Sequence, residues 1–254
     1  MPVSLYLTPY DILLVILVSI QAAALAYMRQ PRWKAFLLSL PIPFTLMTLS
    51  IGRPINATNV LGLVYLLLFA QAVRLLHKGA RLPIIPAIIL AALGYCLLAS
   101  VTAPLIPKTT LAFWLAWGFT VSLGLVLYLW LPHRIEPAYR TDLPVWIKLP
   151  TILGVVTLLV LIRNSLQGFA TLFPLVGVMA MYESRYSLWT IGRQFTVIMV
   201  SMGTMMGVAY LVQAHWSLFP ALIAGWIVFL PVFGAITLNM WLKMSRLPES
   251  SLAS

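Results

Sequence analysis

Long runs of apolar residues, separated by short polar or proline-containing links, dominate the pattern along this chain. Nine of these runs approach the length that a helix needs to cross the roughly 30 Å hydrocarbon core of a bilayer. They span residues 11–28, 35–52, 57–76, 84–103, 110–131, 149–163, 168–184, 194–213 and 218–242. The pattern therefore predicts an all-α, polytopic membrane helical bundle with about nine transmembrane helices.

Two of the runs, 149–163 and 168–184, are shorter than the others. Two ordinary helices, whose ends reach a few residues beyond the apolar pattern, are the favoured interpretation. The alternative is a re-entrant pair that enters and leaves the bilayer on the same side.

The basic residues are distributed unevenly between the links. Three of the 16, Arg53, Lys108 and Arg163, fall in one set of alternate links, and all the others fall in the second set. That second set comprises Arg29, Arg32, Lys34, Arg74, Lys78, Arg81, Arg134, Arg140, Lys148, Arg185, Arg193, Lys243 and Arg246. Because Lys and Arg collect on the cytoplasmic side, the alternation predicts an outer N-terminus and a cytoplasmic C-terminus.

Composition narrows the class of protein further. The chain is 62% hydrophobic and 8% charged, whereas soluble domains average about 25% charged residues. This excludes a soluble enzyme, a nucleic-acid-binding protein and a disordered chain, and it makes membrane lipid the first partner. The net charge of +11 is mostly the topology signal described above. Short links, and a first run without the basic segment of a cleaved signal, predict a multi-pass protein of a bacterial inner membrane.

An internal repeat emerges when the chain is aligned with itself at an offset of 113 residues. Runs 84–103 and 110–131 then fall on 197–216 and 223–244, and boundary residues coincide. The coinciding pairs are Gly79 with Gly192, Gly94 with Gly207, and Pro107 with Pro220. The alternative is independent use of glycine and proline at helix ends.

The repeat predicts a plan of one leading helix and two four-helix repeats. Since four spans return the chain to its starting side, the two repeats would run parallel. The divisions are a leading helix 1–30, repeat 1 at 31–134, a cytoplasmic link 135–143, repeat 2 at 144–246 and a cytoplasmic tail 247–254.

Two outer links combine an arginine with small polar residues at a helix start. Helix N-termini and guanidinium groups both favour anions. We therefore expect a substrate-binding site for a small anion, formed by Arg53, Asn56, Thr58, Arg163, Gln167 and Thr171. The alternative is a pair of interfacial loops whose arginines extend toward the headgroups.

Acidic residues are scarce, and Glu183 lies near the cytoplasmic end of the seventh run. A carboxylate at membrane depth indicates a coupling role, such as carrying a proton. The alternative is an ion pair with Arg185 or Arg193. Asp11 begins the first run, where a negative charge favours a helix N-terminus.

Prolines and glycines inside the predicted helices give a further indication of function. Pro41, Pro43, Pro174 and Pro231 fall inside predicted spans, where proline kinks a helix either for packing or for gating. Gly203 and Gly207 have the spacing that lets two helices approach closely, and a packing role is favoured.

Metal and cofactor sites are not expected. The single cysteine, Cys96, excludes a multi-cysteine centre, and His77, His133 and His215 are scattered. No nucleophile elbow or phosphate loop is present, so we expect no enzyme activity and no cofactor.

Three classes of function remain. The leading hypothesis is a secondary transporter, a permease that moves a small polar, anionic solute by alternating access and is coupled to protons through Glu183. The alternative is a non-catalytic subunit or assembly factor of a larger membrane complex. An intramembrane enzyme is third. It needs acids or histidines gathered at one depth, and no such cluster can be assembled from the five acids and three histidines of the sequence. A homodimer or a partner membrane subunit fits the first two classes.

Overall fold

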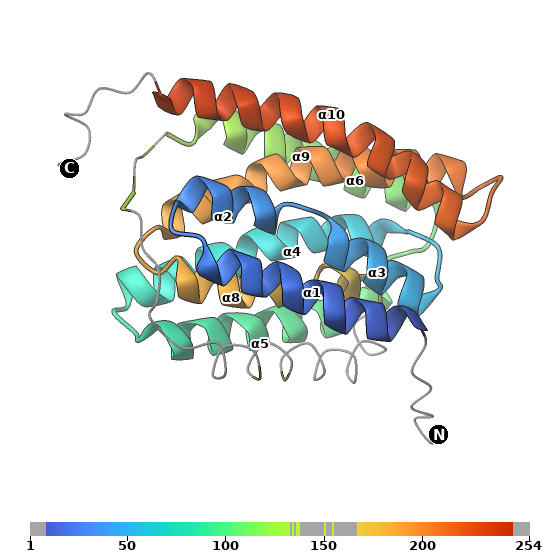
Figure 1. The fold of residues 1–254 in the computed structure, drawn as a ribbon. Helices are drawn as coiled ribbons and strands as arrows, with labels where there is room; N and C mark the ends of the chain where they lie inside the picture. Colours follow the sequence, from blue (N-terminus) through green and yellow to red (C-terminus); the bar gives the residue numbers. More distant parts are fainter. Residues whose placement is uncertain are drawn as a thin grey trace.

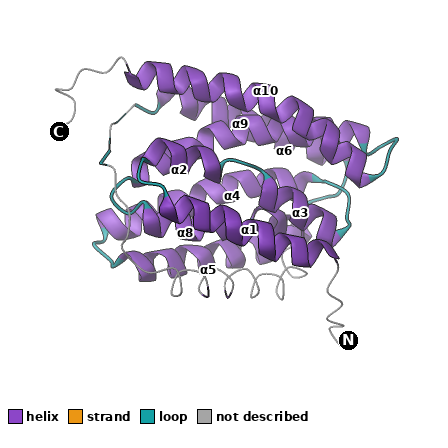
Figure 2. Ribbon diagram, in the orientation of Figure 1, coloured by secondary structure: helices purple, strands orange, loops and turns teal. Residues whose placement is uncertain are grey.

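In the computed structural model, the chain folds into a bundle of helices that run back and forth along one direction (Figure 1). The structure describes residues 9–132, 134, 136, 137, 150, 154 and 167–245. The described α-helices are α1 (Pro9–Tyr27), α2 (Pro31–Leu38), α3 (Ile42–Ile51), α4 (Ala57–Arg74), α5 (Ile84–Thr102), α6 (Thr110–Trp130), α8 (Leu175–Glu183), α9 (Leu188–Val212) and α10 (Leu218–Ser245). Shorter turns are the π-helical η1 (Leu75–Gly79) and the 3₁₀ helices η2 (Ala103–Leu105) and η3 (Gln167–Leu172). Helices and their connections account for the described part of the chain, which confirms the all-α prediction within it (Figure 2).

Seven helical segments among the described residues are long and apolar enough to cross a membrane. They are Pro9–Tyr27, Pro31–Ile51, Ala57–Gly79, Ile84–Leu105, Thr110–Trp130, Leu188–Val212 and Leu218–Lys243. The predicted run 168–184 is a shorter apolar segment, Gly168–Glu183, and the predicted run 149–163 lies outside the described residues. The multi-pass class is therefore supported, while nine spans remain a prediction.

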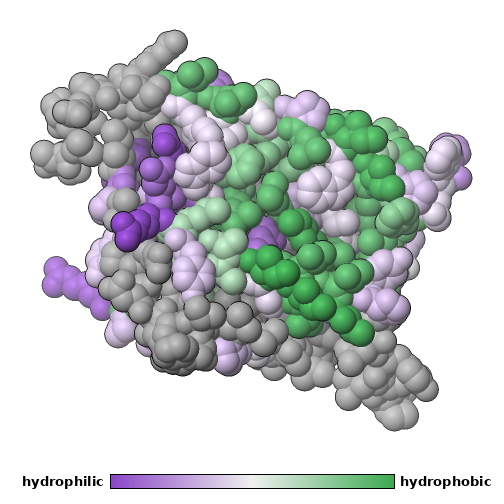
Figure 3. Space-filling model, viewed as in Figure 1, coloured by the Kyte–Doolittle hydropathy of each residue, from purple (hydrophilic) through white to green (hydrophobic). Residues whose placement is uncertain are grey.

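Helix α9 forms the centre of the bundle. In its most apolar 18-residue stretch, 72% is buried, against 22–44% in the corresponding stretches of the other six long segments. Helix α9 packs against α4, α6 and α10. The other helices turn large side chains outward, among them Leu97 of α5 and Leu129 of α6. Hydrophobic residues cover much of the face in Figure 3, and its strongly hydrophilic residues lie mainly toward one end. Such a surface suits a solvent of lipid chains.

The charged residues separate the bundle into two ends, which we name after Lys34 and Arg53. The Lys34 end holds the links 28–30, 80–83 and 184–187, and the Arg53 end holds the links 52–56, 106–109 and 213–217. Ten of the twelve described Lys and Arg residues lie toward the Lys34 end, and the other two are Arg53 and Lys108. The alternation predicted from the sequence therefore matches the threading of the described chain.

Two helices are broken near the middle of the bundle. The first break separates α2 from α3 at Leu40–Pro41, and the second separates η3 from α8 at Pro174. Proline causes both, because it lacks an N–H group and its ring clashes with the preceding turn. By contrast, α10 continues through Pro231. The predicted irregularities at Pro41 and Pro174 are therefore helix breaks, while the predicted kink at Pro231 stays a prediction.

Two basic residues predicted in links instead belong to helices and are buried. Lys34 lies in the first turn of α2, and Arg193 lies in the second turn of α9, which begins six residues before the predicted run 194–213. A prediction from hydropathy alone places the helix boundary so that the charged residue falls outside the helix. In the structure, α2 and α9 include Lys34 and Arg193.

The predicted repeat remains a prediction. Among the described residues, α5 and α6 align with helices α9 and α10 at the 113-residue offset, but α4 is continuous where its counterpart is divided between η3 and α8. The divisions at 1–30, 31–134 and 144–246 are not decided by this, and much of 135–166 lies outside the described residues.

Glycines let α6 lie close to α9. A Cβ atom at Gly124 would lie 2.8 Å from Cβ of Met199, and one at Gly207 would lie 2.8 Å from Nε1 of Trp117. Trp117 Nε1 donates a hydrogen bond of 2.8 Å to the carbonyl of Gly203. The packing role predicted for Gly203 and Gly207 is confirmed, with Gly124 as the matching residue on α6.

Replacing Gly124 by valine should destabilise the bundle, because the new side chain meets Met199 and lies 3.3 Å from the carbonyl oxygen of Thr196. Overpacking of this kind costs about 1–3 kcal/mol. Gly118→Val, on the same helix with no atom within 4 Å, is the matched control. Thermal unfolding of the purified protein in detergent should show a lower midpoint for Gly124→Val alone, and equal midpoints would contradict the close approach.

Candidate functional site

A cleft of about 600 Å³ opens at the Arg53 end of the bundle. Three segments form its walls: the link before α4, the link that leads into α6, and the end of α9. Its lining residues are Pro54, Ile55, Asn56, Lys108, Thr109, Thr110, Phe113, Trp114, Tyr210, Leu211, Gln213, Ala214 and His215. A cleft of this size accommodates a small molecule.

The cleft has an aromatic wall and basic polar groups. The Phe113 and Tyr210 rings stack with centroids 3.6 Å apart, and Trp114 meets both rings edge-on. Lys108 and His215 are the basic residues of the lining, and no Asp or Glu occurs among the lining residues. This charge balance favours an anion over a cation.

A reciprocal pair of hydrogen bonds fixes the mouth of the cleft. The Gln213 side chain donates to the carbonyl of Ile55 at 2.8 Å, and its Oε1 accepts from the Ile55 N–H at 2.9 Å. Gln213 follows the last residue of α9, so the central helix is attached directly to the link that carries Arg53.

A second, much smaller cavity adjoins the cleft and shares Pro54, Asn56 and Lys108 with it. Its volume is about 20 Å³, enough for about one water molecule. Its lining is Thr48, Ile51, Arg53, Pro54, Asn56, Asn59, Lys108, Gly168 and Thr171. The two described basic residues of this end, Arg53 and Lys108, therefore lie on one cavity.

The start of α4 is held by a reciprocal cap. Asn56 Oδ1 accepts from the Thr58 N–H at 2.9 Å and from the Thr58 hydroxyl at 2.7 Å, while Asn59 Oδ1 accepts from the Asn56 N–H at 2.9 Å. Asparagine is favoured at this position because its side chain satisfies N–H groups left free at a helix start. The local sequence thus fixes three polar side chains beside the cavity.

The polar start of α4 contacts η3 directly. Asn59 Nδ2 donates to the Thr171 hydroxyl at 3.1 Å and to the Gly168 carbonyl at 3.4 Å, and the Thr171 hydroxyl donates to the same carbonyl at 2.6 Å. The two segments expected to supply matching halves of a binding site therefore meet in the structure.

The sequence-predicted binding residues have different outcomes. Arg53, Asn56 and Thr171 line the small cavity together. Thr58 is buried and bonded to Asn56 rather than lining a cavity. The remaining two are not placed as side chains: Gln167 is known only as the first residue of η3, and Arg163 lies outside the described residues.

Sequence reasoning missed Asn59 and Lys108. Lys108 is one of the three basic residues in the predicted outer links, and that rarity was the available signal. Asn59 stands three residues after Asn56, a spacing typical of a capping box.

A third cavity, of about 50 Å³, lies where the two helix breaks meet. Pro41 and Pro43 line it from one break, and Pro174 lines it from the other. Thr171 lines both this cavity and the small cavity next to the cleft. The polar contact between α4 and η3 therefore separates the outer cavities from the two breaks.

Side chains from neighbouring helices donate to backbone carbonyls at the first break and in η3, the segment that precedes the second break. Gln21 of α1 donates to the carbonyls of Leu37 at 2.7 Å and Leu40 at 3.4 Å. Tyr95 of α5 donates to the Phe169 carbonyl at 2.8 Å. In lipid, an irregular backbone persists only when such partners replace water.

Near the Lys34 end, the two broken helices are tied together by buried charged residues. Lys34 Nζ of α2 donates to the carbonyl oxygen of Glu183 in α8 at 2.7 Å, and both side chains are at most 1% exposed. Glu183 thus lies deep in the protein, with Lys34 as a neighbour that the sequence did not indicate. The Arg185 guanidinium lies 5.3 Å from the ring centroids of Tyr182 and Tyr186.

Asp11 is also buried, although it was expected only to favour a helix start. The Ser50 hydroxyl at the end of α3 donates to its carboxylate. Within the described part of the chain, no group of three His, Cys, Asp or Glu residues is arranged to hold a metal ion.

Comparison of the chain with protein-family models, with curated proteins and with solved structures gave no match. The functional interpretation therefore rests on the geometry described above.

Gly168 is the closest contact in the site, and replacing it by alanine should disrupt the junction between α4 and η3. A Cβ atom there would overlap the Thr58 hydroxyl oxygen and would lie 3.0 Å from the Asn59 backbone nitrogen. Gly94→Ala in α5, with no atom within 4 Å, is the matched control.

In thermal unfolding, Gly168→Ala should lower the midpoint, while Gly94→Ala should leave it unchanged or raise it slightly, since alanine favours helix. A midpoint for Gly168→Ala equal to that of the parent protein would show that η3 does not press on α4 in this way.

Proposed function

We propose that this chain is a membrane transporter for a small anionic solute. The observation that carries the proposal is the meeting of two proline-broken helices at a cavity that shares Thr171 with a basic site at the Arg53 end. Discontinuous helices that meet in the bilayer interior are typical of secondary transporters, where unwound backbone contacts the substrate and half-helices move.

The outer cleft supports the choice of an anion. Arg53, Lys108 and His215 all lie on the cleft or on the adjoining cavity, and the lining of neither contains a carboxylate. A guanidinium can hold a carboxylate or phosphate by two parallel hydrogen bonds, while an ammonium adds attraction with less directionality. We infer that the solute first contacts Lys108 and then Arg53.

The polar junction behind Arg53 would form the next step. Asn56, Asn59 and Thr171 present amide and hydroxyl groups between the cleft and the two breaks. Separating Asn59 from Thr171 would connect the outer cavity with the middle cavity and would expose polar groups able to bind the solute. Arg163 and Gln167 keep their proposed roles as part of the same site.

The buried contact of Lys34 with α8 would close the opposite end. It joins the half-helices α2 and α8 on the far side of both breaks from the cleft. We propose that this arrangement is the state open at the Arg53 end, and that transport requires α2 and α8 to separate. Protonation of Glu183 would favour that separation. A neutral carboxyl group loses less hydration free energy than a carboxylate does when its surroundings become partly apolar. This is how Glu183 would couple transport to protons.

The proposed orientation places the Arg53 end outside and the Lys34 end in the cytoplasm, in a bacterial inner membrane. It rests on the concentration of basic residues at the Lys34 end. Nine spans and two parallel repeats belong to the same proposal.

The orientation can be tested with single cysteines in a Cys96→Ser background, because Cys96 is the one cysteine of the sequence. Ala214→Cys lies in the link after α9, and Ala80→Cys lies in the link before α5; both positions are exposed. A membrane-impermeant maleimide should label Ala214→Cys in intact cells and Ala80→Cys only after lysis. The reverse labelling would invert the proposed orientation.

Transport is tested by uptake of a panel of small carboxylates, phosphate and sulfate into vesicles that contain the purified protein. Arg53→Gln and Lys108→Gln should each lower uptake of the active anion about tenfold or more, as expected for loss of a charge-assisted hydrogen bond. Arg29→Gln, which removes an exposed charge at the other end, is the control and should transport normally.

If a variant that combines Arg53→Gln and Lys108→Gln takes up the anion at the wild-type rate, the anion site is removed from the proposal. Absence of flux for every anion, together with co-purification of a stoichiometric membrane protein from native membranes, would instead favour the alternative of a non-catalytic subunit.

A further inference from the structure

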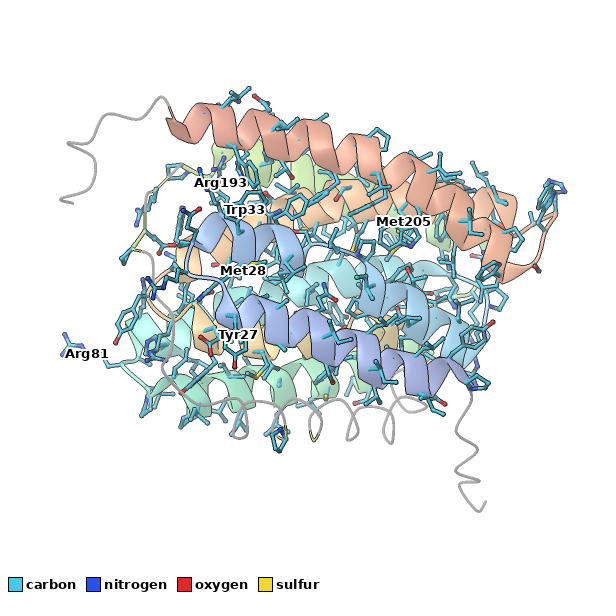
Figure 4. All side chains as sticks on the ribbon, viewed as in Figure 1. Tyr27, Met28, Trp33, Arg81, Arg193 and Met205 are labelled. Atoms are coloured by element: carbon cyan, nitrogen blue, oxygen red, sulfur yellow. The ribbon has the colours of Figure 1, made fainter. Side chains whose placement is uncertain are left out.

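Arg193 is a buried cation that neither the cleft nor the helix breaks employ. It lies in the second turn of α9 and is 4% exposed (Figure 4). Its Nε and Nη2 atoms are buried and donate no hydrogen bond within the structure as described. Burying a guanidinium without a partner is expensive, and intramembrane arginines normally pair with an anionic or carbonyl group.

The two unpaired atoms have a particular geometry. Nε–H and Nη2–H lie on the same edge of the guanidinium plane and point in parallel directions. This edge matches two oxygens of one carboxylate or phosphate group, which it binds through two parallel hydrogen bonds. The unsatisfied donors therefore form a complete bidentate fork rather than scattered single groups.

A second cation contacts the same aromatic ring as Arg193. The Arg193 guanidinium carbon and the Lys243 ammonium nitrogen each lie 5.9 Å from the centroid of the Tyr128 ring. Asn239 donates to the Tyr128 hydroxyl at 3.3 Å and so holds the ring between α9 and α10. The Tyr128 ring of α6 thus lies next to a cation of α9 and a cation of α10.

The described carboxylates at this end contact other residues. Glu136 accepts hydrogen bonds from the backbone N–H groups of Trp189 and Thr190 and lies 3.8 Å from Lys78. Glu183 lies against Lys34. Neither carboxylate accepts from the Nε and Nη2 atoms of Arg193.

We propose that Arg193 and Lys243 form a binding site for a phosphate or carboxylate group at the Lys34 end, between α6, α9 and α10. Lys243 is exposed, so the ligand would approach past it and dock on the Arg193 fork. The same chemistry is offered by the phosphate of an anionic lipid and by a free anion. The site is at the opposite end from Arg53 and does not depend on the transport proposal.

Binding is measured with the purified full-length protein in two arms. In the first, inorganic phosphate is titrated and thermal stabilisation is followed, since a ligand that binds the folded state raises its unfolding midpoint. In the second, phosphatidylglycerol or phosphatidylcholine is added and lipid adducts are counted by native mass spectrometry. A response in the first arm identifies a free-anion site, and preferential retention of phosphatidylglycerol identifies a lipid site.

Arg193→Gln should weaken the positive response about tenfold or more, because it removes both donors and the charge. Arg193→Lys should restore part of it, since it returns the charge without the fork. Lys243→Gln changes an exposed residue and should weaken binding without affecting folding. Arg32→Gln, which removes a cation 5.9 Å from the Trp241 ring at the same end, is the control and should bind normally.

Equal responses from the wild-type, Arg193→Gln and Lys243→Gln proteins would overturn the proposal, as would no response from the wild-type protein in either arm. If Arg193→Gln fails to fold, the Lys243→Gln result decides, because that variant keeps the buried residue intact. Neither outcome changes the interpretation of the uptake assays at Arg53 and Lys108. The binding proposal and the transport proposal are therefore tested independently.

Discussion

Every irregular backbone group in the interior of this bundle needs a partner supplied by the protein, and the architecture follows from that requirement. Proline removes helical hydrogen bonds at the two breaks, and no water is available in a lipid interior to replace them. Gln21 of α1 reaches the Leu37 carbonyl that Pro41 leaves free, while Tyr95 of α5 and Asn59 of α4 donate to carbonyls of η3, the segment before Pro174. Both broken helices are therefore stabilised by these hydrogen bonds, which also hold α1, α4 and α5 in place.

Polar groups follow the same rule at both ends, with different consequences. Near Arg53, the polar side chains are bonded to one another at the rim of an open cleft, so they are positioned while remaining accessible. Near Lys34, two of the cations are inside the packed bundle: Lys34 contacts α8, and the Nε and Nη2 atoms of Arg193 have no partner among the described residues. The bundle thus combines an accessible basic surface at one end with buried charge at the other.

Much of the fold could be predicted from the sequence, because lipid imposes length and hydropathy on every span. The runs now seen as α1, α4, α5, α6 and α10 were recognisable for that reason, and the charge alternation matched their threading. The burial of Lys34 and Arg193 could not be predicted, since hydropathy treats any cation as a mark of a link. In the site, rarity identified Arg53 and helix-start chemistry identified Asn56 and Thr171. The contribution of Lys108 depended on how two links fold toward each other, which only tertiary packing decides.

The reciprocal bond between Gln213 and Ile55 has a mechanical consequence. It fastens the lip of the cleft to α9, the helix most shielded from lipid, rather than to any helix on the perimeter. The lip also joins α3 to α4 along the chain, so it has one covalent and one hydrogen-bonded attachment to the bundle. Sliding or tilting of α9 pulls on the lip at once. The lip at Ile55 is thereby coupled to the centre of the protein, whereas the opposite wall of the cleft belongs to α6, a helix that faces lipid.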